Sequence, residues 1–346
     1  MTDVAVPRTP PRGRIRRWSR LSAASTAAAV AILGVLALAP EFAGSNVVLD
    51  LTNLVILVIL AVMWNALAGF GGMVSIGQQA FIGLGAYGTV YLVHHGQHPY
   101  IAMLEATIFC GIFALPLSVF MLRLRAAQFA IAMWVVAETL AILVTLDSSL
   151  GAGTGTSLIE FNFYEPTQRQ NYTYWWALGA AVISLVVVFA LLRSPLGASL
   201  QAIRDDEEAA RSLGVRVTEV KTVLFVLAAL GCGAAGAATL ANTLFIEPTS
   251  IFSIQYTAYM IFMVLVGGLG SFEGPILGAI VLFVIQTEFI SNGTVYLTGI
   301  GATAILFAIF LPRGVWGAVT DRFGIQLLPV GRELVVSEEQ EQEPGP

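Results

Sequence analysis

The sequence predicts an all-α polytopic membrane protein with about ten transmembrane helices and one long, charged cytoplasmic loop. Three observations predict this class. Of the 346 residues, 57% are hydrophobic and only 11% are charged, which leaves too few polar side chains to cover a soluble domain. The mean hydropathy is +0.80. Apolar runs of membrane-spanning length recur along the chain, and threading them through a membrane places 16 of the 17 basic residues on one side.

The first element is a basic cytoplasmic N-terminal segment, residues 1–20, followed by an apolar run over 21–39. Residues 37–39 resemble a signal-peptide cleavage site, but Pro40 would follow the cleaved bond. The run is also close to the ~20 residues that a membrane span requires. We therefore expect an uncleaved first transmembrane helix.

Nine further apolar runs complete a transmembrane domain over residues 21–312, in which the third and eighth spans are short or interrupted by glycine. With the N-terminus inside, Arg169 is the only basic residue outside, in the longest external loop (148–174). That loop is either a landing surface for a partner protein or a solvated connector. The nine runs cover residues 47–69, 75–93, 100–121, 127–147, 175–192, 222–243, 255–267, 275–290 and 295–311.

The last segment, residues 313–346, is predicted to be a cytoplasmic tail. Its end is rich in glutamate, which accounts for much of the formal net charge of −5. This charge therefore gives no indication of a nucleic-acid partner.

Polar residues inside the predicted spans mark candidate functional positions, because polar groups are costly in lipid. Ser75, Gln78 and Gln79 lie in a glycine-rich segment and either line a path or belong to tight helix packing. Glu138 is either a hydrogen-bonded structural carboxyl or a contact for a substrate amine. Interhelical hydrogen bonds are expected for Asn65, Asn242, Gln255, Tyr256 and Gln286.

The remaining sequence features indicate structural roles and no catalytic, nucleotide-binding or metal-binding site. A second glycine-rich stretch, 267–275, is expected to form a turn, and Cys110 and Cys232 are expected to be small packing residues. The single lysine, Lys221, is not in a Gly-Lys-Ser/Thr loop, so the chain carries no nucleotide site of that kind. No cluster has metal-ligand spacing. We expect neither an enzyme nor a bound cofactor or metal.

The charged island Ser194–Lys221 is predicted to contain two short helices. Ser194 and Pro195 are typical of a helix start, and an apolar stripe of Leu196, Leu200 and Ile203 follows. A second helix is expected from Asp205, with acidic residues in its first turn, Arg211 in its last turn and Gly214 as its cap.

Within this island, Glu208, Ala209, Ala210 and Gly214 spell E-A-A-x-x-x-G, which resembles the cytoplasmic coupling loop of ABC importer permeases. Four blocks along the chain are similar to the M-type permease of the branched-chain amino acid uptake system: residues 71–77 with FIGLGAY after them, 123–125 with FAIA after them, 196–236 and 266–279. The sequence departs from that family at Gln78-Gln79, where a His-small pair is frequent. It also lacks the I-x-L-P ending that is common after this motif in other importer permeases.

The resemblance implies a permease subunit in the plasma (inner) membrane that works with a homologous permease, two ATP-binding subunits and an extracytoplasmic solute-binding protein. ATP and Mg²⁺ would bind to the ATP-binding subunits. The loop 193–221 would couple to them through Asp205, Glu208, Ala209, Ala210 and Gly214, and the solute path would include Ser75, Gln78, Gln79 and Glu138. Branched-chain or related amino acids are the implied solutes, and urea or short amides are the alternative. A further alternative, an ion-coupled secondary transporter, would explain the membrane spans but would assign no function to the charged island.

Overall fold

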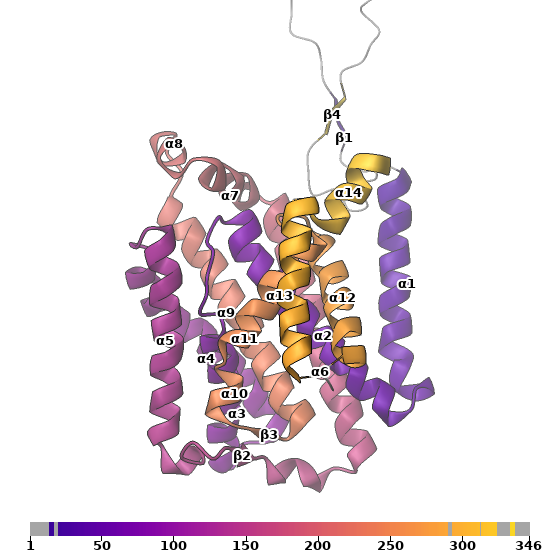
Figure 1. The fold of residues 1–346 in the computed structure, drawn as a ribbon, viewed down its shortest axis with the longest axis vertical. Helices are drawn as coiled ribbons and strands as arrows, with labels where there is room; N and C mark the ends of the chain where they lie inside the picture. Colours follow the sequence, from indigo (N-terminus) through magenta and orange to yellow (C-terminus); the bar gives the residue numbers. More distant parts are fainter. Residues whose placement is uncertain (1–13, 17–19, 290–292, 312, 324–332, 336–346) are drawn as a thin grey trace, which may run out of the picture.

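The structure is a computed structural model that describes residues 14–16, 20–289, 293–311, 313–323 and 333–335. Most of the basic segment 1–20 and the glutamate-rich end of the tail lie outside the described residues. The described part is a helical bundle (Figure 1). Its strands contain only two or three residues each, so the predicted all-α class is confirmed.

Ten apolar helices form the bundle, and each coincides with one of the ten predicted runs. Six of these helices are long and apolar enough to cross a membrane by themselves, and α11 does so together with the short α10 before it, as the span Pro248–Gly267. Helices α3, α12 and α13 are not among these seven candidate spans. The ten helices are α1 (Arg20–Phe42), α2 (Ser45–Asn65), α3 (Gln79–His94), α4 (Pro99–Met121), α5 (Ala126–Leu146), α6 (Pro166–Arg193), α9 (Val217–Thr243), α11 (Ile254–Gly267), α12 (Gly274–Phe289) and α13 (Gly293–Phe310).

Short elements gather at the two ends of the bundle. At one end lie α7, α8, α14 and the β1–β4 pair, and at the other lie β2 and β3 (Figure 1). Both strand pairs are antiparallel, with Ile15 opposite Leu334 and Thr156 opposite Ile246. These elements are β1 (Arg14–Arg16), η1 (Ala66–Phe70), η2 (Ser148–Leu150), β2 (Thr156–Ser157), η3 (Ile159–Phe163), α7 (Pro195–Asp205), α8 (Glu207–Ser212), β3 (Phe245–Ile246), α10 (Pro248–Ile251), α14 (Gly314–Phe323) and β4 (Glu333–Val335).

Helix α9 packs in the centre of the bundle because its glycines and alanines let neighbouring backbones approach closely. A Cβ added at Gly236 would lie 1.9 Å from the carbonyl oxygen of Ile82 in α3. One added at Gly85 of α3 would lie 2.1 Å from the carbonyl oxygen of Gly233. The pair α3–α9 therefore requires glycine on both sides.

Helix α1 is attached to α6 through carbonyl groups near a proline. Pro40 has no backbone N–H, so the carbonyl of Leu36 loses its partner within the helix. The hydroxyl of Tyr174 donates to this oxygen at 2.7 Å, and the indole N–H of Trp175 donates to the carbonyl of Ala37 at 3.0 Å. These hydrogen bonds hold a helix that buries little apolar surface against the rest of the chain.

Candidate functional site

The glycine-rich segment between η1 and α3 is not helical, so the third span is a short helix with a non-helical approach. Gly72 has a φ of +65°, and the indole N–H of Trp64 donates to the carbonyl of Ser75 at 2.9 Å. Gly77 lies directly against α5, since a Cβ added there would be 2.0 Å from the carbonyl oxygen of Met133. Unwound backbone in a membrane protein is tolerated only beside protein or water, so this segment belongs to the bundle interior.

Gln78 and Gln79 are both fully buried but differ in their hydrogen bonds. The Gln79 amide accepts from the Thr257 hydroxyl of α11 at 2.5 Å and donates to the carbonyl of Ile76 at 3.1 Å. Neither side-chain amide atom of Gln78 has a partner among the described residues. Gln79 therefore ties α3 to α11, whereas the amide of Gln78 keeps its hydrogen-bonding capacity.

Glu138 lies away from these glutamines, on the outward face of α5. Met133 and Ala137 point into the bundle, while Trp134 and Glu138 are exposed and share a hydrogen bond of 3.1 Å from the indole N–H to the carboxylate. Of the four predicted path residues, the structure thus gathers Ser75, Gln78 and Gln79 and separates Glu138.

Among the described residues, Asn65 forms long-range hydrogen bonds, to the turn between α11 and α12 rather than to a helix, and the other four positions form no interhelical hydrogen bond. The Asn65 amide donates to the carbonyl of Ser271 at 2.8 Å and accepts from the N–H of Gly270 at 2.9 Å. The side chain of Gln255 bonds within its own helix, to Tyr259. Asn242, Tyr256 and Gln286 make no side-chain hydrogen bond in the part of the chain that the structure describes.

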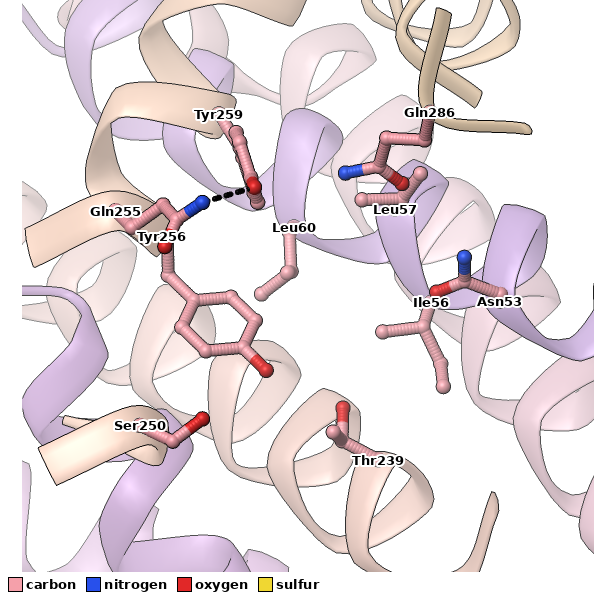
Figure 2. A pocket seen from close by; sticks show the side chains of 10 residues that line it. All are labelled: Asn53, Ile56, Leu57, Leu60, Thr239, Ser250, Gln255, Tyr256, Tyr259 and Gln286. Atoms are coloured by element: carbon pink, nitrogen blue, oxygen red, sulfur yellow. Dashed lines mark hydrogen bonds between the residues drawn. The ribbon is translucent and has the colours of Figure 1, made fainter. Parts of the chain in front are cut away.

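Tyr256, Gln255 and Gln286 instead line a cavity of about 260 Å³ between α2, α9, α10, α11 and α12 (Figure 2). The prediction of interhelical bonds was wrong here because these side chains face this space instead of a polar group on a neighbouring helix.

The glycine-rich stretch 267–275 forms the predicted turn, with α11 ending at Gly267 and α12 starting at Gly274. Gly268 and Gly270 have φ values of +130° and +74°. Arg204 of α7 reaches this region: its guanidinium donates to the carbonyl of Gly69 at 3.0 Å, and a Cβ added at Gly270 would lie 3.2 Å from the same Nη1 atom. Sequence reasoning missed Arg204. Its partner Gly69 is 135 positions away in the chain, and a contact between such distant residues leaves no local sequence pattern.

The charged island forms the two expected helices, α7 and α8, but their boundary differs from the prediction. Asp205 ends α7, and Asp206 is the N-cap of α8, accepting from the N–H groups of Glu208 and Ala209 at 2.9 and 3.0 Å. Asp206 is in an extended conformation, which separates the helices. The start predicted at Asp205 was therefore one residue early.

Helix α7 packs on the bundle with only part of the predicted stripe. Ser194 caps it as expected, and Leu200 and Ile203 are 1% and 4% exposed. Leu196 is 36% exposed, because Gly197 instead faces the end of α6, where an added Cβ would lie 2.2 Å from the carbonyl oxygen of Leu192.

Helix α8 projects from the bundle and presents most of the E-A-A-x-x-x-G motif to the outside. Glu208 and Ala209 are exposed, Ala210 is buried against the chain, and Gly214 has a φ of +87° in the turn that follows. Leu213 is 83% exposed at the tip. The sequence signal for this exposed position was an apolar residue directly before Gly214 in a charged loop, and sequence reasoning did not use it.

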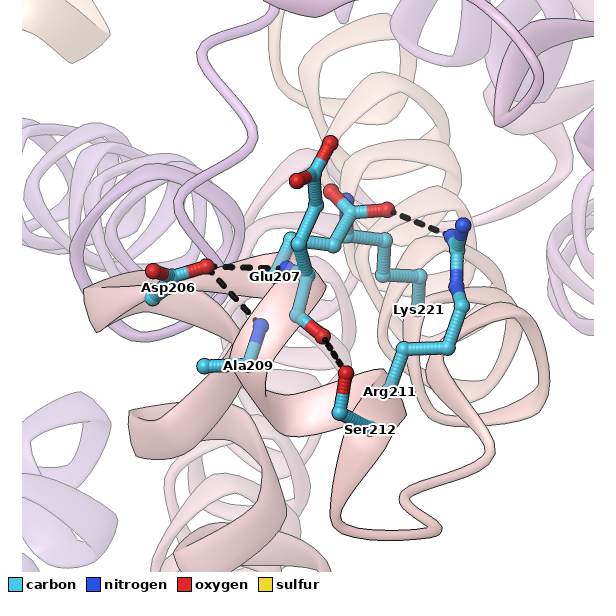
Figure 3. A network of polar contacts seen from close by, with 7 residues as sticks. Asp206, Glu207, Ala209, Arg211, Ser212 and Lys221 are labelled. Carbon is cyan, nitrogen blue, oxygen red and sulfur yellow. Dashed lines mark hydrogen bonds and ion pairs between the residues drawn. The ribbon is translucent and has the colours of Figure 1, made fainter.

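A polar network holds this hairpin in place (Figure 3). The Glu207 carboxylate pairs with Arg211 at 3.1 Å within α8 and also with Lys221 of α9. Lys221 has a side chain only 15% exposed, so this ion pair is better shielded than a typical surface pair. The network fixes the angle at which α8 leaves α9.

The sequence matches the model of the family described as branched-chain amino acid transport system / permease component over residues 46–311, which is most of the chain. The chain belongs to this family. It is therefore a multi-pass membrane protein and a permease component of an ABC transport system, with no catalytic activity of its own.

Individual relatives agree with this assignment. The chain is 31% identical to the high-affinity branched-chain amino acid transport system permease protein LivM of Escherichia coli, over 83% of this chain and 73% of the relative. The LivM protein of Salmonella typhimurium is also 31% identical, over 81% and 72%. The ribose import permease protein RbsC of Bacillus subtilis is 26% identical, over 49% and 54%.

A solved structure shares the fold of this family member. It is described as PsaBC from Streptococcus pneumoniae in complex with Fab, with a TM-score of 0.50 and 12% identity, over 83% of this chain and 99% of the matched chain. At this identity the likeness concerns the fold alone. The permease family implies partners that bind ATP and partners that bind solute, and its members typically carry no cofactor.

Proposed function

We propose that this permease is the membrane subunit of an importer that moves branched-chain or related aliphatic amino acids into the cytoplasm. It would act with a homologous permease, two ATP-binding subunits and an extracytoplasmic solute-binding protein in the plasma (inner) membrane. The observation that carries the proposal is the projecting α7–α8 hairpin, which exposes Glu208, Ala209 and Leu213 for docking. Family membership favours this importer over an ion-coupled transporter.

The orientation of the chain follows from its charges. The N-terminal arginines, the α7–α8 hairpin and the start of the C-terminal tail carry most of the basic residues, and α7, α8 and α14 lie at one end of the bundle (Figure 1). The positive-inside rule assigns this end to the cytoplasm, where ATP is available.

Arg204 supplies a physical connection between the hairpin and the membrane interior. It is a residue of α7, yet it donates to Gly69 at the end of η1, directly before the extended segment that leads to Gln78. A movement of α7 on ATP binding would therefore act on the backbone that positions Gln78. The π-helical turn η1 and the glycines beside it provide the local deformability.

The solute path is proposed to include Gln78 in the bundle interior and, on the other side of α5, the outward face that carries Glu138. A carboxylate facing lipid is costly, so Glu138 is better accommodated where a second permease and a water-filled path cover this face. The amide of Gln78 offers a donor and an acceptor without an intramembrane charge. Ser75 and Gln79 support the backbone and helix packing around it.

The choice of solute follows from the relatives. Two relatives at 31% identity are named for branched-chain amino acid transport, while the ribose permease matches a smaller part of the chain at lower identity. Urea or short amides remain the alternative solute class, because permeases of those systems resemble this one.

The coupling role is tested by a charge reversal in α8 and a new charge at Leu213, the residue that follows it. We expect Glu208→Lys and Leu213→Asp to reduce leucine uptake and solute-stimulated ATP hydrolysis about tenfold or more, since an anchor residue at the centre of an interface contributes ~2 kcal/mol. Membrane insertion should remain normal, because both side chains are exposed. The matched control is Glu41→Lys, the same reversal at the opposite end of the bundle. Full uptake in both α8 variants would refute the docking role.

A further inference from the structure

The cavity of Figure 2 is lined in part by Ser250 of α10. Helix α10 lies in the part of the bundle toward β2 and β3, away from the α7–α8 hairpin (Figure 1). The cavity volume of about 260 Å³ is that of roughly nine water molecules at ~30 Å³ each. This is enough for one small organic solute. Ten described residues line it: Asn53, Ile56, Leu57, Leu60, Thr239, Ser250, Gln255, Tyr256, Tyr259 and Gln286.

Several polar side chains around this space have unused hydrogen-bonding capacity. In the described part of the chain, Asn53, Ser250, Tyr256 and Gln286 make no side-chain hydrogen bond. In Figure 2 the hydroxyl of Tyr256 points into the open space between Ser250 and Thr239. Ser250 is exposed, but Asn53, Tyr256 and Gln286 are half-buried. Polar groups that are withdrawn from water normally find partners, so their convergence on one cavity indicates a polar occupant.

The opposite wall is apolar. Ile56, Leu57 and Leu60 of α2 present aliphatic side chains to the cavity, and all three are largely buried within the bundle. A solute that fills this space therefore needs a hydrogen-bonding part and an aliphatic part, which excludes small, fully polar molecules as the best fit.

The charge around the cavity has one sign. A smaller cavity of about 140 Å³ shares Thr239, Ser250 and Tyr256 with it and is lined in addition by Glu247. No lysine or arginine is among the described residues that line either cavity. A carboxylate without a neighbouring cation favours an ammonium group. Tyr256 lies in the first turn of α11, whose helix dipole favours negative charge at the other end of the solute.

We propose that these two cavities form a binding site for a single aliphatic α-amino acid within this subunit. Its ammonium group would lie toward Glu247, its carboxylate toward the hydroxyl of Tyr256, and its side chain against the aliphatic wall of α2. This deepens the proposed function and rests on it for the class of solute. Helix α10 of this site lies toward the end of the bundle where solute arrives in the proposed orientation (Figure 1).

The test measures binding of radiolabelled leucine to the assembled transporter in lipid nanodiscs, without the solute-binding protein. We expect saturable binding that Tyr256→Phe and Glu247→Gln each weaken by roughly tenfold or more, since the first variant removes a hydrogen bond to a charged group and the second removes the negative charge opposite the ammonium. The matched controls Tyr172→Phe and Glu165→Gln are exposed residues outside both cavities and should bind as wild type. Thermal unfolding of each variant verifies that the bundle is intact.

Competitors identify the chemistry of the occupant. 3-Methylbutylamine, which keeps the ammonium and the aliphatic chain, should displace leucine better than 4-methylpentanoate, which lacks the ammonium. Displacement by acetamide or urea in preference to the amine would overturn the amino-acid assignment. Unchanged leucine binding in both cavity variants, or equal weakening in the controls, would overturn the site.

The proposed function is tested separately by leucine uptake of the complete wild-type transporter with its solute-binding protein. Normal uptake with no cavity-dependent binding refutes only the site. Absence of uptake for every aliphatic amino acid refutes the function, while the nanodisc measurement still decides whether the cavity binds such molecules.

Discussion

Gln78 and Gln79 are adjacent and equally buried, yet the structure predicts opposite effects when each is replaced by leucine. The amide of Gln78 has no partner among the described residues, and leaving such a group unpaired costs about 1–3 kcal/mol. Leucine has a similar volume and no polar group, so Gln78→Leu should raise the free energy of unfolding by about this amount.

For Gln79 the sign is reversed. Gln79→Leu removes the hydrogen bonds with the Thr257 hydroxyl and the Ile76 carbonyl. Interhelical hydrogen bonds in membrane proteins contribute about 0.6 kcal/mol on average and up to ~1.7 kcal/mol, so the loss should lie in this range. Transport should fall in Gln78→Leu, because the solute loses a donor and an acceptor, and should change little in Gln79→Leu.

The assay titrates the purified transporter with sodium dodecyl sulfate in mixed micelles and measures uptake in proteoliposomes. Gln97→Leu, on the exposed turn after α3, is the control and should change stability by no more than about 0.5 kcal/mol. If the Gln78→Leu protein were less stable than wild type, the inference that the Gln78 amide is unpaired would be refuted. Wild-type uptake in both variants would show that this segment only packs.

Two further predictions concern the first helix and the orientation. Tyr174→Phe leaves the carbonyl of Leu36 without its partner, so the midpoint of thermal unfolding should fall relative to wild type and to the exposed control Tyr172→Phe; an unchanged midpoint would mean that this bond does not hold α1. Ser149→Cys should react with an impermeant thiol reagent on intact cells and Ser212→Cys only after permeabilisation, since the two native cysteines are buried; the reverse labelling pattern would contradict the proposed orientation.

The sequence by itself determined the class, the positions of the ten apolar helices and the two helices of the charged island. These features depend on hydrophobic runs and on helix caps such as Ser194. Both are determined by residues that are close together in the sequence, so they can be predicted from it. The misplaced start of α8 is a local exception, because Asp205 and Asp206 are equally good caps and only the backbone conformation distinguishes them.

Only the tertiary structure decided which polar side chains have partners. Thr257, which bonds to Gln79, is 178 positions away, and nothing near Gln78 in the sequence reveals that its amide has none. The outward position of Glu138 and the cavity around Tyr256 likewise depend on how neighbouring helices pack against one another. Helix periodicity states which residues share a face, but the partner of that face is set by packing between segments that are distant in the chain.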